Sequence, residues 1–166
     1  MNDEVQDLPT AFRAAMAAVC TPVSVVTAVV GDRPHGTTVS AFASLSMDPP
    51  MVLVSLDRRS GLLAAVRATG SFGVNVLSSE QSAHAVHFSR KSEDKFAGVD
   101  WEPDGGVPRL PGACGFLACD VETFVDGGDH VVLLGLVRVA AVADGRPLTY
   151  HSRAFGTHSA LEEAVS

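Results

Sequence analysis

The sequence contains few charged residues, few aromatic residues and few cysteines. Charged residues make up 19% of its 166 positions and aromatic residues 6%. The 19 acidic residues outnumber the 12 basic ones, and the net charge of −7 argues against binding to a nucleic-acid backbone. Three cysteines, Cys20, Cys114 and Cys119, cannot all pair within one chain, and no basic-then-apolar leader opens the sequence. We therefore expect a protein of the reducing cytoplasm.

Long apolar runs and several catalytic motifs are also missing. The longest apolar stretch, 131–143, is too short to span a bilayer and contains Arg138, so we expect no membrane association. Neither G-x-G-x-x-G nor a P-loop is present, which argues against the nucleotide-binding folds that carry them. C-x-x-C and G-x-S-x-G are absent, so a dithiol centre and a serine-hydrolase triad lack support. His84 and His87 have helical spacing but no third ligand nearby, which favours solvent-facing roles and predicts no metal site.

Extended segments dominate what is present. Apolar residues at three- and four-residue steps predict a first helix over 8–19, and two further helices are expected at 61–68 and 79–88. Branched and apolar runs predict strands at 23–30, 36–45, 51–56, 71–77, 116–124, 130–142 and 147–155, with a long loop over 102–115. Because the helices are inserted between strands without strict alternation, we predict a mainly β fold. A closed antiparallel barrel decorated by helices is favoured over a doubly wound sheet. We expect one domain over 1–166, with a core at about 9–156 and a frayed tail at 159–166.

The first of three polar clusters lies in the segment 36–46. Hydroxyl side chains at positions 38, 40, 44 and 46 share one face of an extended strand, and small residues at 41 and 43 leave the backbone open. A planar polar ligand could lie against such a strand. An ordinary edge strand rich in Ser and Thr explains the same pattern.

Two further clusters combine hydroxyl groups with cations. Segment 55–60 lies between a strand end and a helix start, where free N–H groups and two arginines suit an anion. A plain helix cap with solvated arginines is the alternative. Segment 88–91, ahead of 94–96, combines an aromatic ring with a hydroxyl and cations, but alone it also fits a charged surface loop.

Together these clusters resemble the short-chain flavin reductases that serve two-component flavin-dependent monooxygenases. The motifs are T-x-S-x-F-x-S-x-S-x-x-P-P at 38–50, F-x-V-N-V-L at 72–77, D-K-F at 94–96 and G-D-H at 128–130, and the likeness extends over about 12–155. It implies an FMN-binding split barrel that takes FMN or FAD and forms a homodimer with the flavin near the subunit interface. It further implies hydride transfer from NADH, with NADPH less favoured, and delivery of reduced flavin to a separate monooxygenase.

The resemblance also assigns roles to residues. It implies that the isoalloxazine lies against Thr37, Thr38, Ser40 and Ala41, and that the ribityl and phosphate end is held by Ser55, Leu56, Asp57, Arg58, Ser60, Phe88, Ser89 and Arg90. His130 would stand beside the nicotinamide and orient it, although a histidine that merely opens a strand is the alternative. Tyr150 and Phe155 would complete the nicotinamide site. Ser152 departs from the glycine of many relatives and leaves the closure of the last strand in question.

Two other functions stay open on sequence grounds. One is a flavin-binding carrier that has the barrel but no productive nicotinamide site. The other is a structural or small-ligand barrel that binds no flavin.

Overall fold

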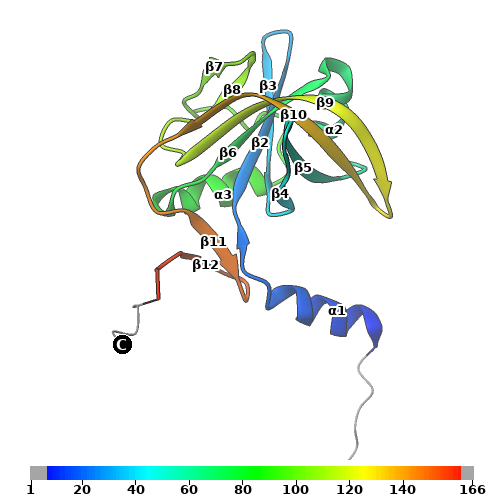
Figure 1. The fold of residues 1–166 in the computed structure, drawn as a ribbon, viewed down its shortest axis with the longest axis vertical. Coiled ribbons are helices and arrows are strands. Elements are labelled where there is room, and N and C mark those ends of the chain that lie inside the picture. Colours follow the sequence, from blue (N-terminus) through cyan, green and yellow to red (C-terminus); the bar gives the residue numbers. More distant parts are fainter. Residues whose placement is uncertain (1–6, 162–166) are drawn as a thin grey trace, which may run out of the picture.

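The structure, a computed structural model, describes residues 7–161, and its centre is a strongly curved antiparallel sheet (Figure 1). Seven strands form this sheet in the order β3-β2-β6-β9-β10-β5-β4. Their bounds are β2 (Ser24–Val30), β3 (Arg33–Val39), β4 (Phe42–Met47), β5 (Pro50–Asp57), β6 (Ser71–Val76), β9 (Gly115–Gly127) and β10 (His130–Val142). The mainly β fold with inserted helices is therefore confirmed. Among residues 7–161, none of the helices has the length and hydropathy that a membrane span requires.

The sheet is open, whereas the sequence predicted a closed barrel. The strand expected over 36–45 is two strands, β3 and β4, which lie at opposite edges of the sheet. The chain turns between them, because Phe42 N donates to Ser40 O and Ser55 N donates to Ala41 O. As a result β3 pairs with β2, β4 pairs with β5, and no ladder joins β3 to β4 across the described chain.

Alternating side chains build the core on the concave side of the sheet. Along β5 the buried residues are Val52, Val54 and Leu56, and they meet Val131 and Leu133 of the neighbouring β10. Helix α2 (Gly61–Thr69) covers one end of this core with its buried residues Leu62, Leu63, Ala65 and Val66 (Figure 1). The predicted helix at 61–68 is thus confirmed with one more residue.

Gly135 allows the β9–β10 hairpin to pack against the buried ring of Phe72. A Cβ added at Gly135 would meet Phe72 Cζ and lie 2.8 Å from Phe72 Cε1. We expect Gly135→Ala to lower the free energy of unfolding by roughly 1 to 2 kcal/mol, because the buried ring has little room to move. Chemical denaturation would measure the loss. Gly61→Ala is the control, since nothing lies within 4 Å of an added Cβ there. An equal loss in both variants would contradict the packing argument.

A second layer follows the other face of β2 and β3. It contains a 3-10 turn, η1 (Ser79–Gln81), and α3 (Ser82–Ser89), which corresponds to the predicted helix at 79–88. Val25 of β2 packs here with Phe88 and Phe96 in a separate apolar cluster. The predicted loop at 102–115 contains a small hairpin of β7 (Glu102–Asp104) and β8 (Val107–Arg109). The buried amide of Asn75 holds this hairpin, donating to Pro108 O and accepting from Leu110 N.

The two ends of the described chain meet in a separate three-stranded sheet. Its strands are β1 (Thr21–Pro22), β11 (Leu148–His151) and β12 (Ala154–Thr157). The last predicted strand is therefore a hairpin, with Ser152 and Arg153 at φ values of 49° and 65° in its turn. Glycine adopts this left-handed region most easily, so Ser152 and Arg153 hold a backbone conformation that is uncommon for residues with a side chain. Of the predicted tail, 159–161 contains no helix or strand and 162–166 lies outside the described residues.

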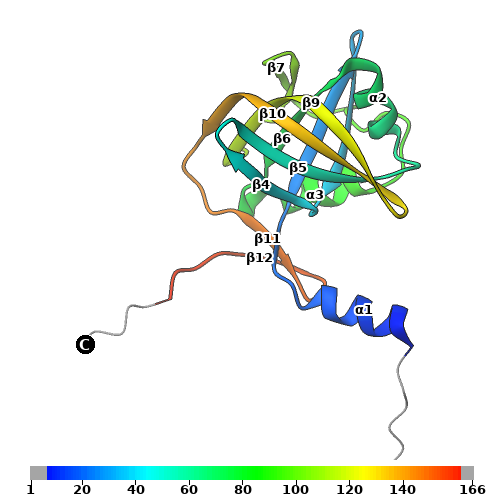
Figure 2. The same ribbon diagram turned by 45° about the vertical axis from the view of Figure 1, so that its right-hand side comes forward.

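Helix α1 (Leu8–Ala17) extends away from the body of the protein (Figure 2). It ends two residues earlier than the sequence predicted. Asp7 caps it by accepting from Thr10 N at 2.8 Å. None of its residues is buried, and its large apolar side chains stay mostly exposed within the described chain.

Candidate functional site

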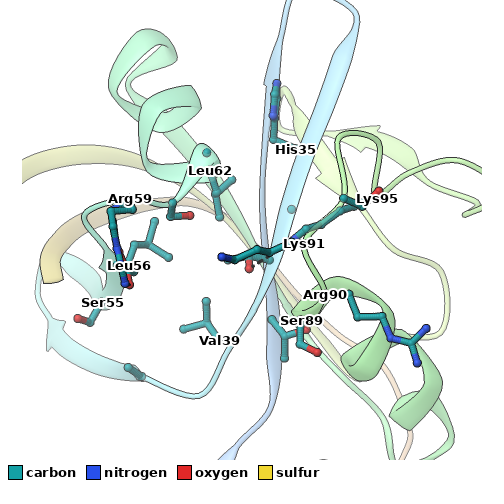
Figure 3. Close-up of a pocket in the computed structure, with 18 of the residues that line it drawn as sticks. His35, Val39, Ser55, Leu56, Arg59, Leu62, Ser89, Arg90, Lys91 and Lys95 are labelled. Carbon is teal, nitrogen blue, oxygen red and sulfur yellow. Dashed lines mark hydrogen bonds and ion pairs between the residues drawn. The ribbon is translucent and has the colours of Figure 1, made fainter. Parts of the chain in front are cut away.

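A cavity of ≈ 610 Å³ lies beside the edge strand β3 (Figure 3). The end of β5, the start of α2, the segment after α3 and the first residue of β10 form the rest of its wall. The structure thus brings together the three polar clusters, which are separate in the sequence. Of the residues predicted for the site, those that line the cavity are Thr37, Thr38, Ser40, Ala41, Ser55, Leu56, Asp57, Ser60, Ser89, Arg90 and His130.

The β3 wall offers mainly backbone groups to a ligand. Thr38 Oγ1 donates to Ala85 O at 2.6 Å, and Thr37 Oγ1 lies 3.5 Å from Phe88 O, so both hydroxyls are turned toward α3. As an edge strand of the sheet, β3 has peptide groups on its outer side that pair with no neighbouring strand. These peptide groups suit the polar edge of a flat ligand.

The corner between β5 and α2 is built around Asp57. Its carboxylate accepts from Arg59 N at 2.7 Å and from Arg59 Nε and NH2 at 3.2 and 3.0 Å. These hydrogen bonds from Arg59 lower the pKa of Asp57 to about 2. Ser60 precedes α2 and makes no side-chain cap, which leaves its hydroxyl and the first N–H groups of the helix beside Arg59. This corner suits an anion.

Arg58, the arginine that the resemblance selected, lies outside the cavity wall. Its Nε donates at 2.8 Å to Gly128 O, in the turn between β9 and β10, and its NH2 pairs at 2.8 Å with Asp126 Oδ1, near the end of β9. Arg59 lines the cavity in its place. Phe88 is also separate from the wall, because its fully buried ring packs in the second apolar cluster.

The segment after α3 supplies cations that sequence reasoning did not select. The amine of Lys91 points into the cavity toward the side of Leu56 and Leu62 (Figure 3). Arg90 contributes to the wall, but its guanidinium extends away from the cavity centre (Figure 3). Lys95 also lines the cavity, and burial lowers its pKa.

Other unselected residues line the cavity along β3 and the core. His35 belongs to β3, and burial, followed by the charge of Arg33, lowers its pKa. Val39 and Leu62 add apolar surface where the cavity meets the core. The sequence carried a signal for Arg59 and Lys91, which both lie within or next to the flagged clusters, but not for the direction of their side chains.

His130 is placed at the cavity margin by its strand register. It opens β10 opposite Asp57 of β5. Its Nδ1 lies 2.7 Å from Asp129 Oδ1, a hydrogen bond that lowers the pKa of Asp129. Because Nδ1 is engaged, Nε2 is the ring nitrogen that can face a ligand.

Tyr150 and Phe155 lie at a second cavity of ≈ 390 Å³. Their rings pack together at 5.3 Å between centroids. This cavity shares Thr38, Ser40 and Ser89 with the first one. The residues predicted for the nicotinamide therefore divide between two adjoining cavities, with His130 in the first.

The first cavity fits a flat polar molecule with an anionic tail. Its volume lies within the range of about 300 to 1,000 Å³ that is usual for cofactor sites. A strand with free peptide groups forms one wall, and Arg59, Lys91 and the start of α2 bring positive charge to another. FMN has this division into a flat ring system and a phosphate tail, so the residues present fit it.

Comparisons with known proteins agree with this geometry. A family described as "Flavin reductase like domain" matches residues 16–159. The reductase subunit HsaB of a flavin-dependent monooxygenase from Mycobacterium tuberculosis H37Rv is 39% identical over 148 residues, which cover 86% of this chain and 79% of HsaB. The FMN reductase (NADH) SmoA of Agrobacterium fabrum is 40% identical over 149 residues, covering 89% of this chain and 85% of SmoA.

Solved structures show the same fold. Nitrilotriacetate monooxygenase component B from Mycobacterium thermoresistibile has a TM-score of 0.85 at 31% identity, with 94% of this chain and 93% of that chain covered. The NADH:FAD oxidoreductase SgcE6 of Streptomyces globisporus has a TM-score of 0.87 at 28% identity, with 96% and 98% covered.

Proposed function

The chain belongs to the flavin reductase-like domain family, and we propose that it transfers a hydride from NADH to FMN or FAD. The reduced flavin then passes to a separate monooxygenase, as the names of HsaB and of component B suggest for those relatives. The observation that carries the proposal is the cavity in which the open edge of β3 faces the cations Arg59 and Lys91. The family match over 16–159 supports it across almost the whole chain.

The chain's own residues hold and orient the reactants. A bound flavin supplies the hydride acceptor, so the protein needs no nucleophile of its own. The peptide groups of β3, together with Ser40 and Ala41, would bind the polar edge of the ring system. The corner from Ser55 to Ser60 would bind the phosphate end. His130 would orient the nicotinamide at the cavity margin, and such alignment accounts for much of the acceleration in a transfer between two bound rings.

Mixing the purified protein with NADH and excess FMN tests this function against its alternatives. A flavin reductase oxidises NADH only when flavin is present. A flavin carrier binds FMN but leaves NADH intact, and a barrel without a flavin site does neither. NADH absorbance and flavin fluorescence, followed in the same sample, separate the three outcomes. FAD in place of FMN, and NADPH in place of NADH, then give the preferences.

We further propose that the open sheet is a split barrel of the FMN-binding type and that 1–166 forms one domain. The likeness to component B supports the first point. A cytoplasmic location is proposed as well, and the free thiols of Cys20, Cys114 and Cys119 agree with it.

A homodimer completes the proposal, and α1 supports it. Its apolar residues Leu8, Phe12 and Met16 are 80%, 61% and 48% exposed. A helix of this length is marginal in water unless its apolar face is covered. The proposed cover is a second copy of the chain, which would bury these side chains at an interface.

A substitution in α1 tests the dimer. We expect Phe12→Glu to shift the protein from dimer to monomer, because a carboxylate replaces an apolar side chain in the proposed interface. Arg13→Glu changes the charge at the next position of the same helix, about 100° around its axis, and is the control expected to stay dimeric. Gel filtration with light scattering gives the molar mass. A wild-type monomer, or a dimer that survives Phe12→Glu, would contradict this interface.

A further inference from the structure

The D-K-F motif at 94–96 has no role in the function described so far. It lies in the segment 90–101, which follows α3 and contains no helix or strand. The same segment supplies Arg90, Lys91 and Lys95 to the cavity wall. An irregular segment keeps one conformation only through specific contacts, and the motif supplies several.

Asp94 holds the local turn of the segment, and Phe96 anchors the segment on its buried side. Asp94 Oδ1 accepts from the backbone N–H groups of Phe96 at 3.0 Å and Ala97 at 3.1 Å. The buried ring of Phe96 meets that of Phe88 with 5.1 Å between centroids. Both rings pack on the bare backbone of Gly36, where an added Cβ would lie 2.9 Å from Phe88 Cε1 and 3.1 Å from Phe96 Cε2. The segment is thereby anchored to β3.

Lys95 makes the contacts on the cavity side. Its Nζ donates to Phe88 O in the last turn of α3 at 2.7 Å and to Thr37 Oγ1 of β3 at 3.4 Å. Its own carbonyl lies 2.7 Å from His87 Nε2. A cation is favoured at the C-terminal end of a helix, where carbonyl groups lack partners within the helix. Lys95 therefore ties three parts of the cavity wall together: α3, β3 and its own segment.

We propose that the D-K-F motif is a latch that fixes residues 90–93 at the flavin cavity, with Lys95 as a positioning residue. The ammonium of Lys95 is committed to Phe88 and Thr37, whereas the amine of Lys91 points into the cavity (Figure 3). The latch holds Lys91 where it can meet the anionic end of the ligand. The ligand's identity rests on the proposed function, but the latch itself is a property of the protein without ligand.

Hydrogen exchange on the flavin-free protein tests the latch directly. We expect Lys95→Met to speed amide exchange over 90–97 by about tenfold or more, since the segment loses its ties to α3 and β3. Lys91→Met removes the same charge from the same segment without touching the latch, and its exchange is expected to match wild type.

Lys95→Arg, which keeps a donor cation, is expected to restore most of the protection. If Lys95→Met does not fold, Thr37→Val removes one of the two acceptors and is expected to give a smaller increase. Unchanged exchange in the folded variants overturns the latch.

A double-mutant cycle on FMN binding tests the positioning role. Lys91→Met and Lys95→Met should each lower the affinity for FMN about tenfold more than the affinity for riboflavin, which lacks the phosphate. In the Lys95→Met background, Lys91→Met should lower the FMN affinity by less than about a further twofold, because Lys91 is no longer held in place. Additive losses with normal exchange would make Lys95 a direct ligand and overturn the proposal. A wild-type protein that binds no flavin would overturn the proposed function, while the exchange experiment would still decide the latch.

Discussion

Replacement of His130 by alanine is expected to slow NADH-dependent flavin reduction by one to two orders of magnitude, about 1.4 to 2.8 kcal/mol of transition-state stabilisation. The strand register of His130 places its ring at the cavity margin opposite Asp57, and the hydrogen bond to Asp129 fixes the orientation of the ring. A ring held in this way can align a nicotinamide, and misalignment is costly in a transfer between two bound molecules. Flavin affinity should change little, because the residues proposed for the phosphate and the ring edge are untouched.

Rapid-mixing kinetics at saturating flavin would measure this effect on hydride transfer itself. Asp129→Asn keeps the shape but weakens the hold on the imidazole, so a smaller loss in the same direction is expected. His158→Ala removes an exposed histidine away from both cavities and is the control. If His130→Ala turns over at the wild-type rate, the residue is only the first residue of a strand. A parallel loss of flavin affinity would assign it to flavin binding.

Strand and helix positions could be predicted from the sequence because their patterns are local. The alternation of Val52, Val54 and Leu56 marks β5 in the sequence and also in the core. The break between β3 and β4 could not be predicted in this way, since 36–45 contains no proline, and no glycine after Gly36, to mark a turn. The turn depends on a hydrogen bond from Ser55, which is distant in the sequence. The closed barrel was predicted from helices inserted between strands, a pattern that does not show how the edge strands pair.

The candidate site shows the same division between local and distant information. The clusters that hold Thr37, Ser60 and Ser89 could be identified from residue types, and the structure brings them to one cavity. The place of Tyr150 and Phe155 at a second cavity depends on the pairing of β11 with β1, which no local pattern specifies. The roles of all these residues in ligand binding remain predictions.

Two adjacent arginines offer a matched test of the proposed phosphate site. By residue type and position alone Arg58 and Arg59 have equal claims, because both follow the same strand and precede the same helix, although the resemblance selected Arg58. Arg58 turns toward the β9–β10 turn and pairs with Asp126 and Gly128 O. Arg59 turns toward the cavity, where Asp57 holds its guanidinium. The structure therefore predicts opposite outcomes for two substitutions that are chemically the same.

Arg59→Ala is expected to lower the affinity for FMN by roughly ten- to thirtyfold and the affinity for riboflavin by less than about twofold, because only FMN carries the phosphate. Loss of the guanidinium also leaves the Asp57 carboxylate without its partner beside the bound anion, and the like charges repel. Asp57→Asn combined with Arg59→Ala should therefore recover part of the lost FMN affinity. Arg58→Ala should leave both ligands within about twofold of wild type. Fluorescence titration of the three variants with both flavins measures the six affinities. A larger loss of FMN affinity in Arg58→Ala than in Arg59→Ala would place the phosphate on the other side of the β5–α2 corner.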